Sequence, residues 1–418
     1  MRPILSVLVL AAALSAALRG ESIRVAFPAE RQKLGAVSQT YLIGSVAPGR
    51  TETLYVGGVT TAVHRTGAFI QMVPVTPGTN RVVVHRGGVR LVRTFVVAAP
   101  ASPAPEKTEP PILTDDDPRL GPPAVWRTTG CLLANRVRAE IKEGETIFFL
   151  PRGFEFRGAE VKGTAWIAAW LENRRGYLPK SCVMRVPGIP AGGLPPKGLV
   201  VPDPQTGFPL LPPYGKPPSS VRICVDAGHG GSDVGAVSPH GWYEKDVNLM
   251  QARALRDALE KAGFGVVMTR DGNATRKLLD RPMLAYDERV DAFISIHHNS
   301  TAEHRDPRQV RHTTTYASTT NGLALARCVQ KHLAQVMAPV PDAGAQMKSL
   351  AVCRNPSVPS CLVEVDFINL PEGEEESWNP VRQKKVADAI VCGVLDWMAP
   401  PPEPKPENPA PVSEEKDE

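Results

Sequence analysis

Four residues in separate segments of the sequence have the side chains needed for metal-assisted hydrolysis: His229, Glu244, His297 and Glu364. Two imidazoles and one carboxylate, with one coordination position left to water, form the ligand set of a catalytic zinc ion. Such an ion lowers the pKa of bound water from about 15.7 to about 7 and polarises a carbonyl oxygen. These residue types therefore predict one Zn²⁺ held by two histidines and one carboxylate.

The fourth residue, Glu364, lies in the otherwise apolar run Cys361–Val365. An acid in the middle of a buried strand needs a compensating role, because burying a charge is costly. We predict that Glu364 is the catalytic residue, which takes a proton from water and passes it to the leaving nitrogen. A buried ion pair with Arg281 or Arg354 is the alternative.

Each predicted metal ligand also has a structural explanation. His229 could cap a helix, Glu244 could be a solvated loop acid, and His297 could be a core histidine. The two histidines and Glu364 follow or end separate predicted strands, and Glu244 precedes a predicted helix. This common placement favours one shared site over unrelated structural roles.

Residues 221–398, the third module, alternate apolar runs with stretches of helical periodicity. Strands are predicted at 221–226, 265–269, 292–296 and 360–365, and helices at 246–262, 278–290, 321–337 and 381–398. This order predicts an α/β fold with a largely parallel sheet flanked by helices on both faces. The first long helix is expected to have Asp246 as its N-cap and Gly263 as its left-handed end.

Residues 22–98, the first module, contain short alternating apolar runs separated by turn signals such as Pro77-Gly78. Short strands at regular spacing predict a small β-sandwich. Segments between 41 and 80 resemble the immunoglobulin-like accessory modules of secreted bacterial enzymes. His64 and His85 are interpreted as surface strand residues and not as metal ligands.

Residues 125–186, the second module, also have the pattern of short strands. The run that contains Trp166, Trp170 and Gly176–Pro179 resembles the second half of an SH3-like β-barrel. Trp166, Trp170 and Tyr177 could line a groove for peptide or sugar, or they could fill a small core. We favour the core for Trp166.

Proline marks the boundaries between these modules. More than half of the 42 prolines fall in 99–123, 187–220 and 400–411. Pro-rich linkers are therefore predicted at 99–124 and 187–220, and a disordered acidic tail at 399–418. Such linkers would let the third module search a polymer while tethered.

The N-terminus predicts export. Arg2 precedes the apolar run Ile4–Leu14 and then small residues, which is the layout of a signal peptide over residues 1–20. The run is short for a membrane span, although an N-terminal anchor is the alternative. We therefore expect a periplasmic or cell-envelope protein with no stable membrane span in the mature chain.

The net charge of the chain indicates which class of macromolecule it binds. The net charge is +5, without a long run of lysine or arginine. This modest excess suits an anionic polymer and gives little support for a nucleic-acid partner, so we expect none.

The seven cysteines do not form a disulfide scaffold, and no CxxC motif is present. Cys131 with Cys182 and Cys353 with Cys361 are the pairs that the spacing would allow in an oxidising compartment. Buried free thiols are expected elsewhere, at Cys224 and Cys392.

The four chemical residues fall in segments with a known family pattern. The segments are ICVDAGHGGSDVGA, EKDVNLMQARALRDALEKAGFGVVMTR, AFISIHHNS and PSCLVEVDFI. In this order they resemble the zinc-dependent N-acetylmuramoyl-L-alanine amidases with a type 3 catalytic domain, across nearly all of 221–398. The resemblance implies a secreted enzyme that hydrolyses peptidoglycan between N-acetylmuramic acid and L-alanine. It also implies that His229, Glu244 and His297 hold the metal and that Glu364 is catalytic.

The sequence departs from the family pattern at a few positions. Ala227 replaces the usual proline, and Tyr286 stands where asparagine is common. The segment Arg311–Tyr316 lacks the expected glycine and glutamate, which puts the substrate preference in question. His298 occupies a position where the family usually has a small residue, so we do not expect it to be a ligand.

Two other functions are alternatives to this enzyme activity. A different zinc peptidase would be supported by an HxxE ligand pair, but Ser232 stands three residues after His229. A non-catalytic wall-binding protein would be favoured by the loss of a ligand, yet all four residues are present.

The interval from His297 to Glu364 leaves no room for the blocking helix of some relatives, so we expect a site that is open without an activator.

Overall fold

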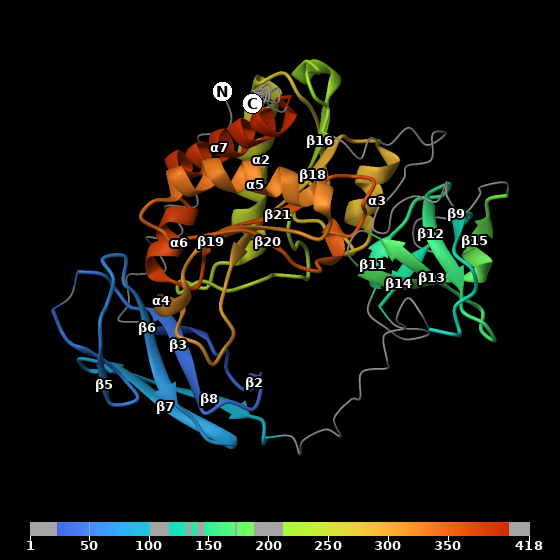
Figure 1. Ribbon diagram of the computed structural model, residues 1–418. Helices are drawn as coiled ribbons and strands as arrows, with labels where there is room; N and C mark the ends of the chain where they lie inside the picture. Colours follow the sequence, from blue (N-terminus) through green and yellow to red (C-terminus); the bar gives the residue numbers. More distant parts are fainter. Residues whose placement is uncertain are drawn as a thin grey trace, which may run out of the picture.

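The structure is a computed structural model that describes residues 23–49, 51–100, 117–130, 135–139, 146–171, 174–187 and 212–400 (Figure 1). The expected signal peptide, most of both expected linkers and nearly all of the expected tail lie outside these residues. The described residues include three modules, each with a hydrophobic core of its own.

The first module consists of two β-sheets with a core between them. One sheet contains β1 (Arg24–Phe27), β3 (Gln39–Ser45) and β6 (Ala68–Pro74), and the other contains β2 (Lys33–Leu34), β8 (Val89–Val97), β7 (Gly78–Arg86), β4 (Leu54–Val56) and β5 (Val59–Thr61). Leu42 and Phe69 of the first sheet pack with Val84 and Phe95 of the second. Two packed sheets agree with the expected sandwich architecture. The immunoglobulin-like assignment stays a prediction.

The two histidines of the first module have structural partners. His85 stacks on Tyr55 with ring centroids 4.8 Å apart. Nδ1 of His64 lies 3.0 Å from Oγ1 of Thr66. Both observations agree with structural roles for these histidines.

The second module is one antiparallel sheet of seven strands. In spatial order these are β11 (Thr146–Phe149), β10 (Arg136–Arg138), β14 (Arg174–Pro179), β13 (Trp166–Leu171), β12 (Glu155–Glu160), β9 (Ala124–Thr128) and β15 (Val183–Arg185). Trp166 packs against a small cluster that contains the buried Tyr177, whereas the guanidinium of Arg175 lies 5.1 Å from the ring centroid of Trp170. Trp166 and Tyr177 therefore contribute to a core. The SH3-like assignment stays a prediction.

The third module has a six-stranded, largely parallel sheet, as expected. Its order is β17 (Gly265–Met268), β16 (Arg222–Ala227), β18 (Ala292–Asn299), β21 (Ser360–Phe367), β19 (Thr313–Ala317) and β20 (Asp342–Met347). All neighbouring strands are parallel except β19 and β21, which are antiparallel. The carboxyl ends of β16, β18 and β21 therefore lie at the same edge of the sheet.

The two faces of this sheet are covered differently. Helices α2 (Glu244–Lys261), α5 (Thr320–Met337) and α7 (Pro380–Met398) pack over one face, where Val225 and Ile294 lie in the core. The other face contains Cys224, Phe293 and Leu362 and is covered by α3 (Asp280–Asp287) and η4 (Ala351–Cys353). Alternate residues of one strand point to opposite faces, which explains why these strands read as continuous apolar runs.

Two expectations about helix ends have different outcomes. The residue before α2 with extended backbone is Tyr243, so Asp246 is not the N-cap. Asp246 lies instead in the first helical turn, where its negative charge interacts favourably with the positive end of the helix dipole. Gly263 has a φ of +93°, which confirms the left-handed residue after the helix.

The cysteine expectations are confirmed only in part. Cys353 and Cys361 are free thiols in the structure, not the pair that the spacing allowed. Cys224 is buried as expected, but Cys392 is exposed because it lies on the solvent side of α7. Cys131 lies outside the described residues, so its pairing with Cys182 stays a prediction.

The first module packs directly against the third (Figure 1). Tyr41, Ile43 and Ile70 on the outer face of β3 and β6 form an apolar cluster with Phe367 and Leu370, which follow Glu364 in the chain. The tethered search expected from the linkers therefore does not describe these two modules, because a shared apolar cluster holds them together.

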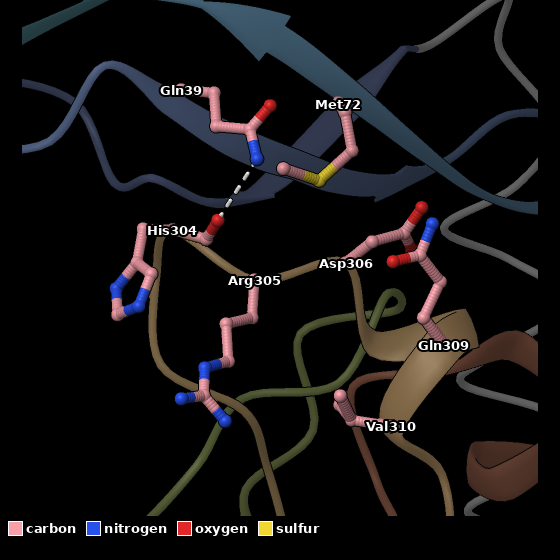
Figure 2. Close-up of a pocket in the computed structure, with 7 residues that line it drawn as sticks. All are labelled: Gln39, Met72, His304, Arg305, Asp306, Gln309 and Val310. Atoms are coloured by element: carbon pink, nitrogen blue, oxygen red, sulfur yellow. Dashed lines mark hydrogen bonds between the residues drawn. The ribbon is translucent and has the colours of Figure 1, made fainter.

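A hollow of about 460 Å³ remains along this contact (Figure 2). Gln39 and Met72 from the first module face the loop and short helix α4 (Pro307–Val310), and Nε2 of Gln39 donates to the carbonyl oxygen of His304 at 3.2 Å. In the described parts of the chain, no helix is long and apolar enough to cross a membrane.

Candidate metal centre

The predicted site residues meet at the carboxyl edge of the third module's sheet. His229 follows β16, and His297 and Glu364 lie on the neighbouring strands β18 and β21. Glu244 is the first residue of α2. Four residues that are far apart in the sequence are thus brought together by the parallel strand order.

The carboxylate of Glu244 lies between the two imidazoles. Its Oε2 is 3.2 Å from Nε2 of His229, and its Oε1 is 2.9 Å from Nδ1 of His297. One ligand atom from each of the three residues lies within 4.8 Å of the others. The side chain of Glu244 is 7% exposed, whereas those of His229 and His297 are 25% and 16% exposed. Glu244 is therefore buried beneath the group, whereas the two histidines are accessible to solvent.

This donor set fits a zinc ion. Zinc binds histidine nitrogen and carboxylate oxygen at about 2.0–2.2 Å in a tetrahedron, so two ligand atoms of one ion lie about 3.3 Å apart. The two nitrogen-to-oxygen distances around Glu244 are close to that separation. Three protein ligands are also the number that a catalytic zinc site uses.

Two glycines make the close approach of these side chains feasible. A Cβ atom on Gly228 would lie 2.2 Å from Nε2 of His297. Gly235 has a φ of +66°, and a Cβ there would lie 2.5 Å from Oε2 of Glu244. Larger residues at these positions would displace a ligand, which gives the glycine-rich segment a definite steric role.

Hydrogen bonds keep the Glu244 carboxylate in place. Its Oε2 accepts from the backbone N–H of Ala236 at 2.9 Å, and its Oε1 accepts from Nδ2 of Asn248 at 3.1 Å. Asn248 lies one turn further along α2, so helix geometry places it on the same face. These partners were not predicted, because nothing in the sequence distinguishes Asn248 from other polar helix residues.

The pKa directions show an anionic carboxylate between cationic imidazoles. Burial alone would raise the pKa of Glu244, but hydrogen bonds to His229 and His297 hold it well below its usual range. Burial acts against charge on His229 as well, yet Glu244 and Asp233 raise its pKa to about 9. Metal binding would therefore displace protons from the histidines, and the affinity should increase with pH.

A buried ion pair supports the segment that carries His229. Nη1 of Arg281 donates to Oδ1 of Asp226 at 2.6 Å, and its Nη2 donates to the carbonyl oxygen of His229 at 2.7 Å. Oγ of Ser295 also donates to Asp226, at 2.6 Å. His229 itself has a left-handed φ of +59°, which is uncommon outside glycine. Arg281 thus fixes an unusual backbone conformation at a candidate ligand.

His298 lies beside the group but outside it. Its Nδ1 is 2.9 Å from Oδ1 of Asn248, on the side of the strand away from His297. Burial lowers the pKa of His298 to about 4, so the ring is neutral near pH 7. The structure therefore provides a separate structural partner for this histidine, in line with the expectation that it is not a ligand.

Glu364 is not part of a buried ion pair with either arginine named from the sequence. Arg281 is bonded to Asp226, and Arg354 donates to Ser349. The Oε2 atom of Glu364 is buried and has no hydrogen-bond partner among the residues that the structure describes. Burial raises the pKa of Glu364 to about 7. A perturbed, unpartnered carboxyl group beside three convergent candidate ligands has the character of a functional residue.

Comparisons with known proteins identify the family of the third module. Residues 223–396 match the Amidase_3 family, described as N-acetylmuramoyl-L-alanine amidase. The protein YqiI of Bacillus subtilis is 31% identical over 179 residues, which cover 43% of this chain and 85% of YqiI. The probable cell wall amidase LytH of Staphylococcus saprophyticus is 34% identical over 45% of this chain.

Other relatives match the same module. The N-acetylmuramoyl-L-alanine amidase AmiC of Escherichia coli is 29% identical over 43% of this chain. The chain spans 62% of the length of LytH and 53% of that of AmiC. The solved amidase AmiC2 of Nostoc punctiforme is 31% identical, with a TM-score of 0.40, over 43% of this chain and 97% of that structure. Through residues 223–396, this chain belongs to the Amidase_3 family of N-acetylmuramoyl-L-alanine amidases.

Proposed function

We propose that this chain is a zinc-dependent hydrolase of peptidoglycan. It cleaves the amide bond that joins the lactyl group of N-acetylmuramic acid to L-alanine. The observation that carries the proposal is the convergence of His229, Glu244 and His297, whose ligand atoms lie within 4.8 Å of one another. The family match, the probable cell wall amidase LytH and the N-acetylmuramoyl-L-alanine amidase AmiC support the substrate class.

His229, Glu244 and His297 would hold the zinc ion. When bound, zinc supplies an acidified water and stabilises the negative charge that develops on the carbonyl oxygen. Nδ1 of His229 lies 2.9 Å from Oδ1 of Asp233, so this exposed carboxylate supports the ring electrostatically. A ligand imidazole that is oriented by a second carboxylate is a common support for metal sites.

Glu364 moves the proton. Its carboxylate accepts a proton from the attacking water and returns it to the departing amine of L-alanine. A carboxyl group with a pKa of about 7 suits both steps near neutral pH, because it exchanges a proton at little cost in either direction. The strand position of Glu364, opposite His297, keeps the base at one place relative to the ligands.

The site operates without removal of a blocking helix. Of the helices between His297 and Glu364, α5 packs with α7 on the opposite side of the sheet, and α4 spans only Pro307–Val310. The exposed fractions of the ligand histidines leave access from solvent.

The protein acts outside the cytoplasm, in the periplasm or cell envelope, where peptidoglycan lies. The expected signal peptide 1–20 and the relatives named as cell wall amidases support this location. Peptidoglycan, with its glycan and stem peptide, is the partner that this proposal requires.

The test is digestion of purified peptidoglycan with and without a chelator, with the products identified by mass spectrometry. Release of intact stem peptides with a free L-alanine amine, abolished by the chelator and restored by Zn²⁺, would support the proposal. Cleavage within the stem peptide would indicate a different zinc peptidase. Binding without any cleavage, at one zinc ion per chain, would indicate a wall-binding protein.

A further inference from the structure

The antiparallel strand β19 places a tyrosine beside the proposed catalytic glutamate. Thr314 pairs with Glu364, and Tyr316 pairs with Leu362, in the register of β19 and β21. Since side chains alternate along a strand, Tyr316 and Glu364 lie on the same face of the sheet as diagonal neighbours, about 7–8 Å apart. This is the face that α3 covers, and Tyr316 packs against its core.

A lysine covers the ring of this tyrosine. Nζ of Lys348 lies 4.5 Å from the ring centroid of Tyr316, a cation–π contact. The backbone of Lys348 is held on both sides. Its N–H donates to the carbonyl oxygen of Ala317 at 2.8 Å, and its carbonyl oxygen accepts from Oγ of Ser318 at 2.8 Å. The backbone of Lys348 is therefore held in place directly after β20, although the residue itself is exposed.

Lys348 carries a positive charge that no acidic residue in the described part of the chain pairs with. Among the described residues, its ammonium group has no carboxylate within ion-pair distance. Other cations near the site do have such partners, since Arg281 is bonded to Asp226 and Arg311 to Asp366. The charge of Lys348 nevertheless lies at the edge of the site, because its ammonium group sits over Tyr316, the diagonal neighbour of Glu364.

We propose that Lys348 and Tyr316 bind the free carboxylate of the second stem-peptide residue and so make the enzyme selective for acidic stem peptides. This inference rests on the proposed function. The amide that is cleaved precedes L-alanine, and two extended residues span at most about 7 Å. That length matches the separation of Glu364 and Tyr316, so the next carboxylate of the substrate reaches the ammonium group.

The substrate class follows from the chemistry of this position. A glutamate that is linked to the next residue through its side chain keeps a free α-carboxylate, whereas its amidated form presents a neutral carboxamide. A carboxylate pairs with the ammonium group of Lys348, and a carboxamide lacks the charge to do so. The difference between the two substrates is one charge at one atom.

The experiment compares two synthetic muramoyl peptides that differ only in this carboxylate or carboxamide. An exposed ion pair is worth at most about 1 kcal/mol, so the wild-type kcat/KM should favour the carboxylate substrate by roughly threefold to fivefold. Lys348→Met keeps the apolar stem over Tyr316 and should bring this ratio close to one, mainly through KM. Lys348→Arg should retain the preference. High salt should reduce it in the wild type, because an exposed charge is screened.

Lys385→Met is the matched control, since Lys385 is an exposed lysine on α7, over the other face of the sheet. It should keep the wild-type ratio. If Lys348→Met lowers kcat/KM equally for both substrates, or leaves the ratio unchanged, the inference is wrong while the proposed function stands. If the wild type cleaves neither peptide and does not digest peptidoglycan, the proposed function fails, and the inference fails with it.

Discussion

Glu364 on β21 lies directly beside His297 on β18 in the parallel register of the two strands. The proposed base and one proposed ligand therefore sit on neighbouring strands within the sheet, and not on loops. Strands 292–296 and 360–363 are buried, so the backbone hydrogen bonds between them hold both side chains at a fixed separation. This rigidity suits a site in which a proton must move over a short distance.

We expect Glu364→Gln to abolish turnover and to leave the metal in place. Glutamine has the same shape but cannot take a proton at this position, so kcat should fall about 10²–10⁴-fold. The measurement is kcat on peptidoglycan fragments together with zinc content by mass spectrometry. Glu260→Gln, on the exposed side of α2, is the control and should change neither. Near-normal turnover would refute the assignment of the base, and loss of zinc would make Glu364 a ligand.

Neighbouring histidines give a test of the ligand set. His297→Gln should lose zinc, because it removes one of the three proposed ligands. His298→Gln should retain one zinc ion per chain, since His298 contacts Asn248 and its neutral ring is not needed for charge balance. Zinc titration followed by the shift in thermal midpoint distinguishes the two variants. Equal zinc loss in both would contradict the assignment.

The fold of the third module could be predicted because its strands are strongly patterned. The apolar run before Asp226 and the helical spacing that ends at Gly263 carry enough local information. β20 (Asp342–Met347) was missed because most of its residues are small or polar and none of them is fully buried. The acidic helix α6 (Pro371–Ser377) was missed for a similar reason, since its sequence has little apolar periodicity.

The candidate site was also predictable only in part. His229, Glu244, His297 and Glu364 follow from the residue types at strand ends, and the structure brings them together. The pairing of Arg281 with Asp226 was not predicted, because a long-range partner depends on helix packing and not on local sequence.

The sequence contains an indication of the contact between the first and third modules that our prediction did not use. Tyr41, Leu42 and Ile43 are consecutive apolar residues on β3, and all are buried. A strand in a free two-sheet module should alternate between apolar and polar residues, so this run already indicated burial on both faces. Our prediction of tethered modules rested on the Pro-rich segments alone.

Arg281→Met should destabilise the third module strongly. It would leave the Asp226 carboxylate, which is fully buried, without its cation, at a cost of about 3–5 kcal/mol. Arg222→Met is the control, because Arg222 and Glu288 form an exposed pair worth less than about 1 kcal/mol. The thermal midpoint of the zinc-free protein measures both. A similar small shift for the two variants would contradict the role given to Arg281.

The same pair predicts acid sensitivity. Burial opposes the charge on Asp226, but Arg281, Ser295 and Thr269 hold the pKa of its carboxyl group below the usual value. A lowered pKa in the folded state gives stability that is present above the unfolded value of about 3.9 and is lost as the pH falls through the folded value. Wild-type stability should therefore decline in acid more steeply than that of Asp226→Asn.

The contact between the first and third modules also contains a titratable group. Nδ1 of His240 lies 2.7 Å from Oε2 of Glu374, and its Nε2 lies 3.2 Å from the carbonyl oxygen of Thr66. Both partners accept hydrogen bonds, so both contacts form at once only when the ring carries two protons. Burial lowers the pKa of His240, and Arg24 also opposes the charge, but Glu374 outweighs them and raises the pKa above 6.5.

The docking of the first module should therefore weaken as the pH rises. A raised folded pKa means that the contribution of His240 is complete below the unfolded pKa of about 6.5 and disappears as the pH passes the folded value. At about pH 6, His240→Gln should destabilise the protein by about 1–3 kcal/mol, and the difference from wild type should shrink as the pH rises through the folded pKa of His240. Thermal midpoints and amide hydrogen exchange of β3 and β6 measure the effect. His85→Gln, which removes a histidine stacked on Tyr55 within the first module, should show no such pH dependence at the contact. A constant difference between His240→Gln and wild type across this range would show that the contact depends on shape and not on the proton.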